Sequence, residues 1–221
     1  MSDIEVLERL LADRWSCRGF LDKQVPRETI DRLLEIAGRT PSWCNTQPWH
    51  LSIVSGEATI KLREALMASS DGLGSDFDFP ATYAGDFQER RRETGWQLYE
   101  SLGITKGDRE ASAAQMLKNF EFFGAPHAAI LTTEADLGVY GAIDCGLYVD
   151  SFLLAAQALG LGAIAQAALA MRAPFLREWF GLPETRRVVC AISFGYADSD
   201  HATATYRTSR VPAEQTATFF D

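Results

Sequence analysis

Residues Thr40-Pro41-Ser42-Trp43-Cys44-Asn45-Thr46-Gln47-Pro48-Trp49-His50 form the most distinctive stretch of the sequence. Its two prolines fix φ at about −65° and lack an N–H, so the stretch fits neither a helix interior nor a central strand. Between them lie four side chains that both donate and accept hydrogen bonds: Ser42, Asn45, Thr46 and Gln47. We predict a shaped loop that binds the edge of a flat heterocycle. A polar turn with both tryptophans in the core explains the composition equally well.

A second motif lies upstream, where residues 14–20 read Arg-Trp-Ser-Cys-Arg-Gly-Phe. The guanidiniums of Arg14 and Arg18 can each bind phosphate oxygens in a bidentate manner, and the hydroxyl of Ser16 can take a third oxygen. This pattern predicts a phosphate site at the end of a first helix. A solvated basic turn is the alternative that the motif alone leaves open.

Together the two motifs resemble the nitroreductase family of FMN-dependent, NAD(P)H-using oxidoreductases. The shared pattern is Arg-x-Ser-x-Arg followed by Pro-Ser-x-x-Asn-x-Gln-Pro-Trp. The resemblance implies FMN as the cofactor and NADH or NADPH as the electron donor. It assigns nine FMN-binding residues: Arg14, Trp15, Ser16, Arg18, Pro41, Ser42, Trp43, Asn45 and Gln47. In the family the two groups come from different chains, so an intertwined homodimer is implied.

Two later segments extend the resemblance. Residues 163–169 (Ala-Ile-Ala-Gln-Ala-Ala-Leu) are predicted to form a buried strand whose small side chains allow close backbone approach to a ligand. The family's equivalent segment lies against flavin N5, which implies Gln166 and Ala167 as FMN-binding residues through their backbone N–H groups. Near the C-terminus, Ser-Arg-x-Pro resembles the family's closing phosphate arginine and implies Arg210, with Arg207 as a weaker candidate.

The hydrophobic pattern predicts one domain, residues 1–221, with an α+β or mixed α/β fold, and we favour α+β. The resemblance implies a central, mostly antiparallel sheet enclosed by helices. We expect strands at 49–54, 127–132, 163–169 and 187–194, with helices at 3–15, 26–37, 57–68, 87–102, 108–123, 140–159 and 174–180. Residues 69–84 are predicted to be a long surface loop, and loops of this length are often lids.

Composition excludes several classes of protein. The net charge of −9 argues against a nucleic-acid or anionic-membrane partner, since either needs a basic face. Four dispersed cysteines and no secretory signal favour a reduced, cytoplasmic protein. We expect Cys17 and Cys44, which fall within the motifs, to be packing residues rather than redox-active thiols. The three histidines have no ligand-like spacing, so no metal site is predicted.

Residues 140–159 are apolar and about long enough to cross a bilayer. They include Asp144 and Asp150, which would be costly in lipid. We therefore expect a central helix that is buried on most sides and available to a subunit interface, and no membrane partner.

The helix predicted at 87–102 begins with Glu89-Arg90-Arg91-Arg92. Cations at a helix N-terminus oppose the helix dipole, so an anionic group is expected nearby. The resemblance implies that a basic residue here approaches the flavin or nicotinamide, although a solvated charge run explains any single arginine. Residues 86–104 are most similar to the nitrobenzoate-reductase branch of the family.

These observations favour an FMN enzyme that passes hydride from NAD(P)H to a small, flat acceptor such as a nitroaromatic or quinone. No side chain needs to act as a general acid or base, because the flavin carries the chemistry. The alternatives are a flavin-consuming or dehalogenating enzyme of the same fold and a non-catalytic flavin-binding redox module.

Overall fold

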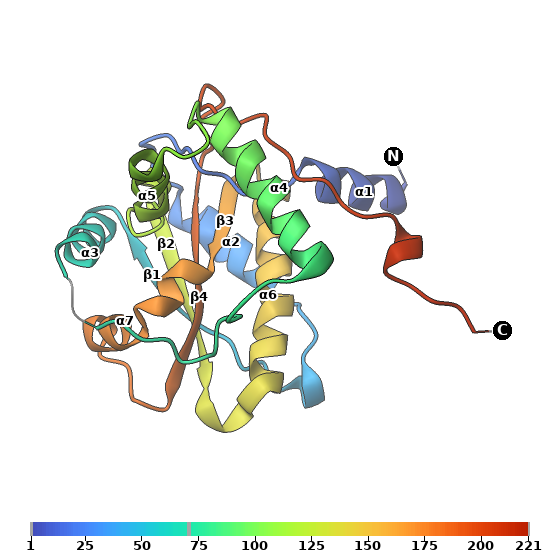
Figure 1. Cartoon of the computed structure of the whole chain (residues 1–221). Helices are drawn as coiled ribbons and strands as arrows, with labels where there is room; N and C mark the ends of the chain where they lie inside the picture. Colours follow the sequence, from blue (N-terminus) through green and yellow to red (C-terminus); the bar gives the residue numbers. More distant parts are fainter. Residues whose placement is uncertain (1, 70–71, 221) are drawn as a thin grey trace.

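The computed structural model describes residues 2–69 and 72–220. Its centre is a four-stranded antiparallel sheet in the order β1-β2-β4-β3 (Figure 1). The strands are β1 (His50–Ser55), β2 (His127–Glu134), β3 (Gly162–Gln166) and β4 (Arg186–Gly195). The prediction of an α+β fold with an antiparallel sheet enclosed by helices is therefore confirmed.

The described chain forms seven α-helices: α1 (Asp3–Asp13), α2 (Arg27–Ala37), α3 (Glu57–Ala68), α4 (Gly85–Ser101), α5 (Arg109–Leu117), α6 (Gly138–Ala158) and α7 (Ala173–Phe180). Helix α1 projects away from the sheet (Figure 1). Helices α2 and α6 pack in one core cluster, and α3 and α7 in another. The sheet lies between these two layers (Figure 1).

The two cores follow from the alternation of side chains along the strands. On β2, Ala129 and Leu131 belong to the α2 and α6 core, whereas Ala128 and Ile130 belong to the α3 and α7 core. Successive side chains of a strand point to opposite faces, so a strand covered on both sides is buried along its whole length. All eight residues of β2 except Glu134 are buried, as this requires.

Two elements end three or more residues earlier than their apolar patterns predicted. The strand expected over 163–169 stops at Gln166, and Ala167–Met171 forms a 3-10 helix. The helix expected over 108–123 stops at Leu117. Phe122 and Phe123 then adopt positive φ values of 56° and 51°, and both side chains are buried. At this point the chain leaves the helix, and a left-handed backbone turn directs the two aromatic side chains into the core.

The loop predicted over 69–84 is anchored near its start. Ser70 and Asp71 lie outside the described residues. The N–H of Gly74 donates to the carbonyl of Met171 at 2.9 Å, and the buried carboxylate of Asp76 accepts from the N–H of Val188 at 2.7 Å. The loop is therefore attached to the region of α7 and β4 before it continues to α4.

Helix α6 corresponds to the apolar segment considered for the membrane. It buries Tyr148 and Phe152 in the core, as predicted for a core helix. Among the described residues, Ala135–Ala158 is the one helical stretch long and apolar enough to span a bilayer, a property that core helices share. Its other side exposes Val139, Tyr140, Ile143 and Leu147.

Candidate functional site

The Arg-x-Ser-x-Arg segment lies along the edge of the sheet. Ser16 forms a parallel bridge with Ala163 of β3, and the N–H of Cys17 donates to the carbonyl of Ala163 at 3.1 Å. In such extended backbone, residues two apart project to the same side, so Ser16 and Arg18 share one side and Cys17 takes the other. A side chain at Gly162 would come within 2.8 Å of Cys17 Sγ, which explains the glycine there.

Cys17 is buried, and burial raises the pKa of its thiol to about 11. A thiol with such a pKa is a poor nucleophile at neutral pH, which supports the packing role expected for it. Cys44 is different. It is exposed on the loop, so the expectation that it is a packing residue is wrong.

Arg18 is partly buried, and burial lowers the pKa of its guanidinium. Its Nη1 donates to the carbonyl of Ser16 at 3.1 Å, and the guanidinium lies 5.8 Å from the centre of the Phe123 ring. Arg14 follows α1 as its C-terminal cap, with extended backbone. Both arginines are thus on a segment whose path is set by α1 and β3.

The C-terminal tail packs against the Arg-x-Ser-x-Arg segment. The guanidinium of Arg207 lies 4.4 Å from the centre of the Trp15 ring, and the hydroxyl of Tyr206 donates to the carbonyl of Thr94 in α4 at 2.9 Å. Arg210 is exposed, and its Nη1 donates to Thr208 Oγ1 at 2.7 Å. The structure therefore places Arg207, the weaker candidate, directly against Trp15, a residue of the predicted FMN-binding set.

At the end of β3, the groups available to a ligand belong to the backbone rather than to side chains. Gln166 is buried, its Nε2 donates to the carbonyl of Asn119 at 2.9 Å, and the hydroxyl of Ser193 donates to its Oε1. The Gln166 side chain is thus occupied within the protein. Ala167 is exposed and begins a 3-10 helix, where N–H groups have no intrahelical acceptor.

The loop between Pro41 and Pro48 has an unusual backbone. Residues 43–45 form a 3-10 turn, and Cys44, Asn45 and Gln47 have positive φ values of 51°, 56° and 48°. Each left-handed residue other than glycine costs about 1–2 kcal/mol. The N–H of Gln47 donates to Ser42 Oγ at 2.9 Å, which closes the loop. Such backbone strain is found at ligand-binding sites.

The two tryptophans of the loop have different environments. Trp49 is partly buried and stacks on Tyr148, with 4.9 Å between ring centres. The core interpretation of this stretch is therefore correct for Trp49. Trp43 is 62% exposed, and its ring lies 4.6 Å from that of Tyr140 at the start of α6. The side chains of Asn45 and Gln47 are exposed beside it.

One residue important to the loop was not identified as a site residue from the sequence. The N–H of Trp43 donates to both carboxylate oxygens of Asp144 in α6, at 3.2 and 3.1 Å. The sequence did contain a signal for this contact, namely an aspartate within an apolar helix, because a buried carboxylate needs a hydrogen-bond partner. What the sequence could not give was the partner, 101 residues away.

The two predicted halves of the site lie at opposite ends of α6 (Figure 1). The loop contacts the helix at Tyr140 and Asp144, whereas the Arg-x-Ser-x-Arg segment contacts Ala163, beyond the helix C-terminus. At a rise of about 1.5 Å per residue, Asp144 and Ala158 are separated by roughly 20 Å. A single chain therefore does not bring the two halves together.

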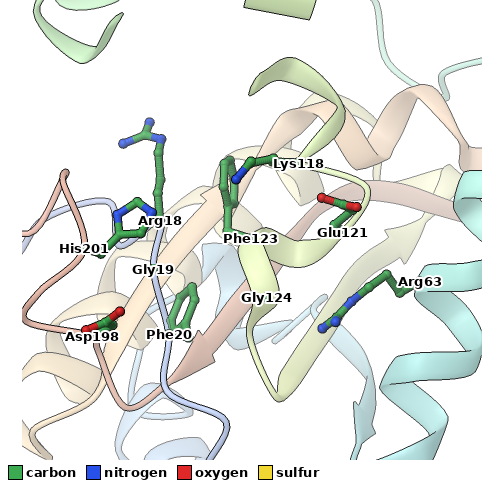
Figure 2. Close-up of a pocket in the computed structure, with 10 residues that line it drawn as sticks. All are labelled: Arg18, Gly19, Phe20, Arg63, Lys118, Glu121, Phe123, Gly124, Asp198 and His201. Carbon is green, nitrogen blue, oxygen red and sulfur yellow. The ribbon is translucent and has the colours of Figure 1, made fainter. Parts of the chain in front are cut away.

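A cavity of about 310 Å³ lies next to Arg18 (Figure 2). Arg63, Lys118, Glu121 and Asp198 line it, so both signs of charge are present. Arg18 is the one residue that it shares with the predicted FMN-binding set, and in Figure 2 its side chain extends away from Arg63. This cavity is therefore not the site that the motifs predict.

The arginine run on α4 is on a helix without buried residues. Arg90 forms an ion pair with Asp86 at 3.4 Å, and Arg91 lies 5.3 Å from the centre of the Tyr83 ring. Across residues 2–69 and 72–220, no group of three or more His, Cys, Asp or Glu side chains is arranged to hold a metal ion.

Comparison with known proteins supports the family resemblance. Residues 11–196 match the model of the nitroreductase family. Nitroreductase NfnB of Mycolicibacterium smegmatis is 36% identical over 218 residues, which cover 97% of this chain and 93% of the relative. A 4-nitrobenzoate reductase of Nocardioides sp. is 34% identical over 223 residues, covering 98% and 90%.

Solved structures agree with the sequence comparison. The FMN-dependent nitroreductase NfnB from Mycobacterium smegmatis, crystallised in complex with NADPH, has a TM-score of 0.94 at 34% identity and covers 100% of both chains. The FMN- and NADPH-dependent NfnB from Sphigopyxis sp. strain HMH has a TM-score of 0.92 at 29% identity, covering 97% and 98%. The family predicted from the two motifs is confirmed: this chain belongs to the nitroreductase family.

Proposed function

We propose that this protein is an FMN-dependent nitroreductase that uses NADPH or NADH to reduce a small nitroaromatic compound. The observation that carries the proposal is the attachment of the Arg-x-Ser-x-Arg segment to β3, beside a backbone segment with small, exposed residues. Relatives named as FMN- and NADPH-dependent nitroreductases support the choice of cofactor and donor. The similarity to a 4-nitrobenzoate reductase supports the acceptor class.

The donors present fit FMN. Arg14, Ser16 and Arg18 offer charged and hydroxyl donors to a phosphate, and the N–H of Ala167 offers a donor to the ring. In the loop, Ser42 Oγ accepts from Gln47, which leaves the hydroxyl hydrogen free to donate outward. The protein would thus bind, orient and shield the cofactor. FMN, when bound, supplies the hydride-transfer chemistry.

We also propose a homodimer with two flavins, each held between the subunits. Because the loop and the phosphate segment lie at opposite ends of α6, a second subunit is needed to bring a loop to each phosphate segment. Exposed apolar side chains are available to form the interface. They lie on α6 (Val139, Tyr140, Ile143, Leu147), on α1 (Ile4, Leu7, Leu11) and in the tail (Phe219, Phe220). Monomeric proteins rarely expose large apolar patches.

A cytoplasmic location is part of the proposal. Its support is the four free cysteines, three of them buried, which suit a reducing compartment. The net charge of −9 supports a small-molecule substrate rather than a nucleic-acid partner.

Visible absorption of the purified protein tests the proposed function. We expect flavin bands that bleach on anaerobic addition of NADPH or NADH and return on addition of 4-nitrobenzoate. A quinone and an iodinated phenol, added in parallel, test the other acceptor classes. A protein that retains FMN without bleaching would be a binding module. A protein that does not bind FMN would contradict the proposal.

A further inference from the structure

Asp144 is a carboxylate within the apolar helix α6. It is 5% exposed, and both of its oxygens lie within hydrogen-bond distance of one donor, the N–H of Trp43. Burial of a carboxylate is unfavourable unless hydrogen bonds compensate for the lost water. A neutral core residue would fill the same space without this cost. The position of Asp144 therefore calls for a role outside core packing.

The loop that Asp144 contacts is the strained one. Cys44, Asn45 and Gln47 all have positive φ, and the bond from Gln47 N–H to Ser42 Oγ lies within the loop itself. The bond from Trp43 to Asp144, by contrast, joins the loop to a long helix. Tyr140, one turn earlier on α6, contacts the Trp43 ring. Residues four apart lie on the same side of a helix, so Tyr140 and Asp144 together support one end of the loop.

We infer that Asp144 is the positioning residue of the 42–47 loop, which its carboxylate holds in the conformation that presents Ser42, Asn45 and Gln47 to the flavin ring. This inference rests on the proposed function for the identity of the ligand. The N–H groups of Asn45, Thr46 and Gln47 also have acceptors within the loop, at 3.0, 3.1 and 2.9 Å. Gln47 Nε2 also donates within the loop, to the carbonyl of Asn45 at 3.4 Å and to Asn45 Oδ1 at 3.3 Å. The loop therefore has the Ser42 hydroxyl hydrogen and the remaining amide hydrogen-bonding capacity of Asn45 and Gln47 to offer to a ligand.

Three variants test the inference. Asp144→Ala removes the acceptor, Asp144→Asn keeps one acceptor oxygen without the charge, and Asp150→Ala alters an exposed aspartate of the same helix as a control. Amide hydrogen exchange of the FMN-free proteins is compared for a peptide spanning 41–49 and for peptides of the sheet. FMN affinity and the spectrum of bound FMN are then measured by titration, and the oligomeric state by sedimentation.

We expect Asp144→Ala to accelerate exchange in peptide 41–49 by roughly tenfold and to weaken FMN binding by a similar factor, since a charged hydrogen bond is lost. The spectrum of the remaining bound FMN should shift. Asp144→Asn should show a smaller effect, roughly threefold, because neutral hydrogen bonds are weaker than charged ones. Asp150→Ala should match the wild type. If the alanine variant does not fold, the asparagine variant is judged by the same criteria.

Exchange in peptide 41–49 and FMN affinity that both remain at wild-type levels would overturn the inference. So would faster exchange that is equal in the loop and the sheet, because it would mean that Asp144 only stabilises the whole fold. Failure of the proposed function gives a different result. In that case the wild type does not bind FMN, while the exchange comparison in FMN-free protein still shows whether Asp144 holds the loop.

Discussion

The backbone N–H of Cys17 donates to the carbonyl of Ala163 at 3.1 Å, and this bond fixes the Arg-x-Ser-x-Arg segment to the edge of the sheet. Ser16 and Arg18 project away from the core while the Cys17 thiol is buried in it. Because β3 leads directly into Ala167, the same strand also sets the position of the backbone predicted to contact the flavin ring.

Loss of Arg18 should weaken FMN retention. A charge-assisted hydrogen bond contributes about 1.5–3 kcal/mol, so Arg18→Ala should weaken FMN binding by roughly ten- to 150-fold. Arg210→Ala tests the tail in the same way. Equilibrium dialysis against FMN gives the affinities. Arg27→Ala is the control, since Arg27 is exposed and pairs with Asp31 at 2.7 Å on α2. Wild-type FMN binding in both Arg18→Ala and Arg210→Ala would rule out the phosphate assignment.

Asp76 should contribute strongly to stability. Its carboxylate is 4% exposed, pairs with Arg177, and lies 3.3 Å from Arg187. Asp76→Ala leaves the mostly buried Arg177 without this partner, and breaking a buried pair costs about 3–5 kcal/mol. Urea unfolding should show this loss. Asp31→Ala, which breaks an exposed pair, should cost less than about 1 kcal/mol. Equal losses in the two variants would show that Asp76 does not anchor the loop.

Stability should fall in mild acid because of His127. Its Nε2 accepts from the N–H of Val25 at 2.9 Å, so the ring is neutral, and burial lowers its pKa below the ordinary value of about 6.5. The unfolded chain therefore binds a proton more readily than the folded protein. Stability attributable to this residue is complete above about pH 6.5 and declines as the pH falls toward the folded-state pKa.

Urea unfolding at pH 7.5 and in mild acid measures this decline. His127→Gln should be less stable than the wild type at neutral pH but should lose less between the two conditions. His50→Gln, at an exposed histidine, should follow the wild type. If His127→Gln loses as much stability on acidification as the wild type, the acid sensitivity comes from other groups.

Turnover should follow a ping-pong mechanism. The sheet is four-stranded and antiparallel, unlike the parallel sheet of dinucleotide-binding domains, so we expect the nicotinamide and the acceptor to occupy one place in succession. Exposed aromatic side chains at Trp43, Phe79 and Tyr83 are candidates for its walls. Double-reciprocal plots at several acceptor concentrations should be parallel, with competitive inhibition by acceptor against NADPH. Intersecting lines with a detectable ternary complex would indicate two sites.

Much of the fold could be predicted because local periodicity decides it. The helix expected at 57–68 has these bounds in the structure, and the strand expected at 187–194 differs from β4 by one residue at each end. The turn after Gln166 could not be predicted, since the run of small apolar residues contains no breaker. We attribute this turn to tertiary contacts, because the Gln166 side chain forms hydrogen bonds with Asn119 and Ser193.

The two sequence segments of the candidate site could also be located from the sequence. The proline-bounded loop and the phosphate motif each have a local pattern of residue types. The support that Asp144 gives to Trp43 joins residues 101 positions apart, so no local pattern contains it. The separation of the two halves along α6 also emerges only from the fold.

A mixed dimer tests the central claim most directly, namely that each flavin site combines the phosphate segment of one subunit with the loop of the other. One subunit carries Arg14→Ala and Arg18→Ala, and the other carries Asn45→Ala and Gln47→Ala, with different affinity tags for purification. Sedimentation first establishes a dimer of twice the 24.4 kDa chain mass. Each variant alone should bind FMN weakly. In the mixed dimer, the shared arrangement restores one native site, so we predict one tightly bound FMN per dimer. A mixed dimer that binds FMN as weakly as either parent, or a flavin-loaded monomer, would contradict the shared site.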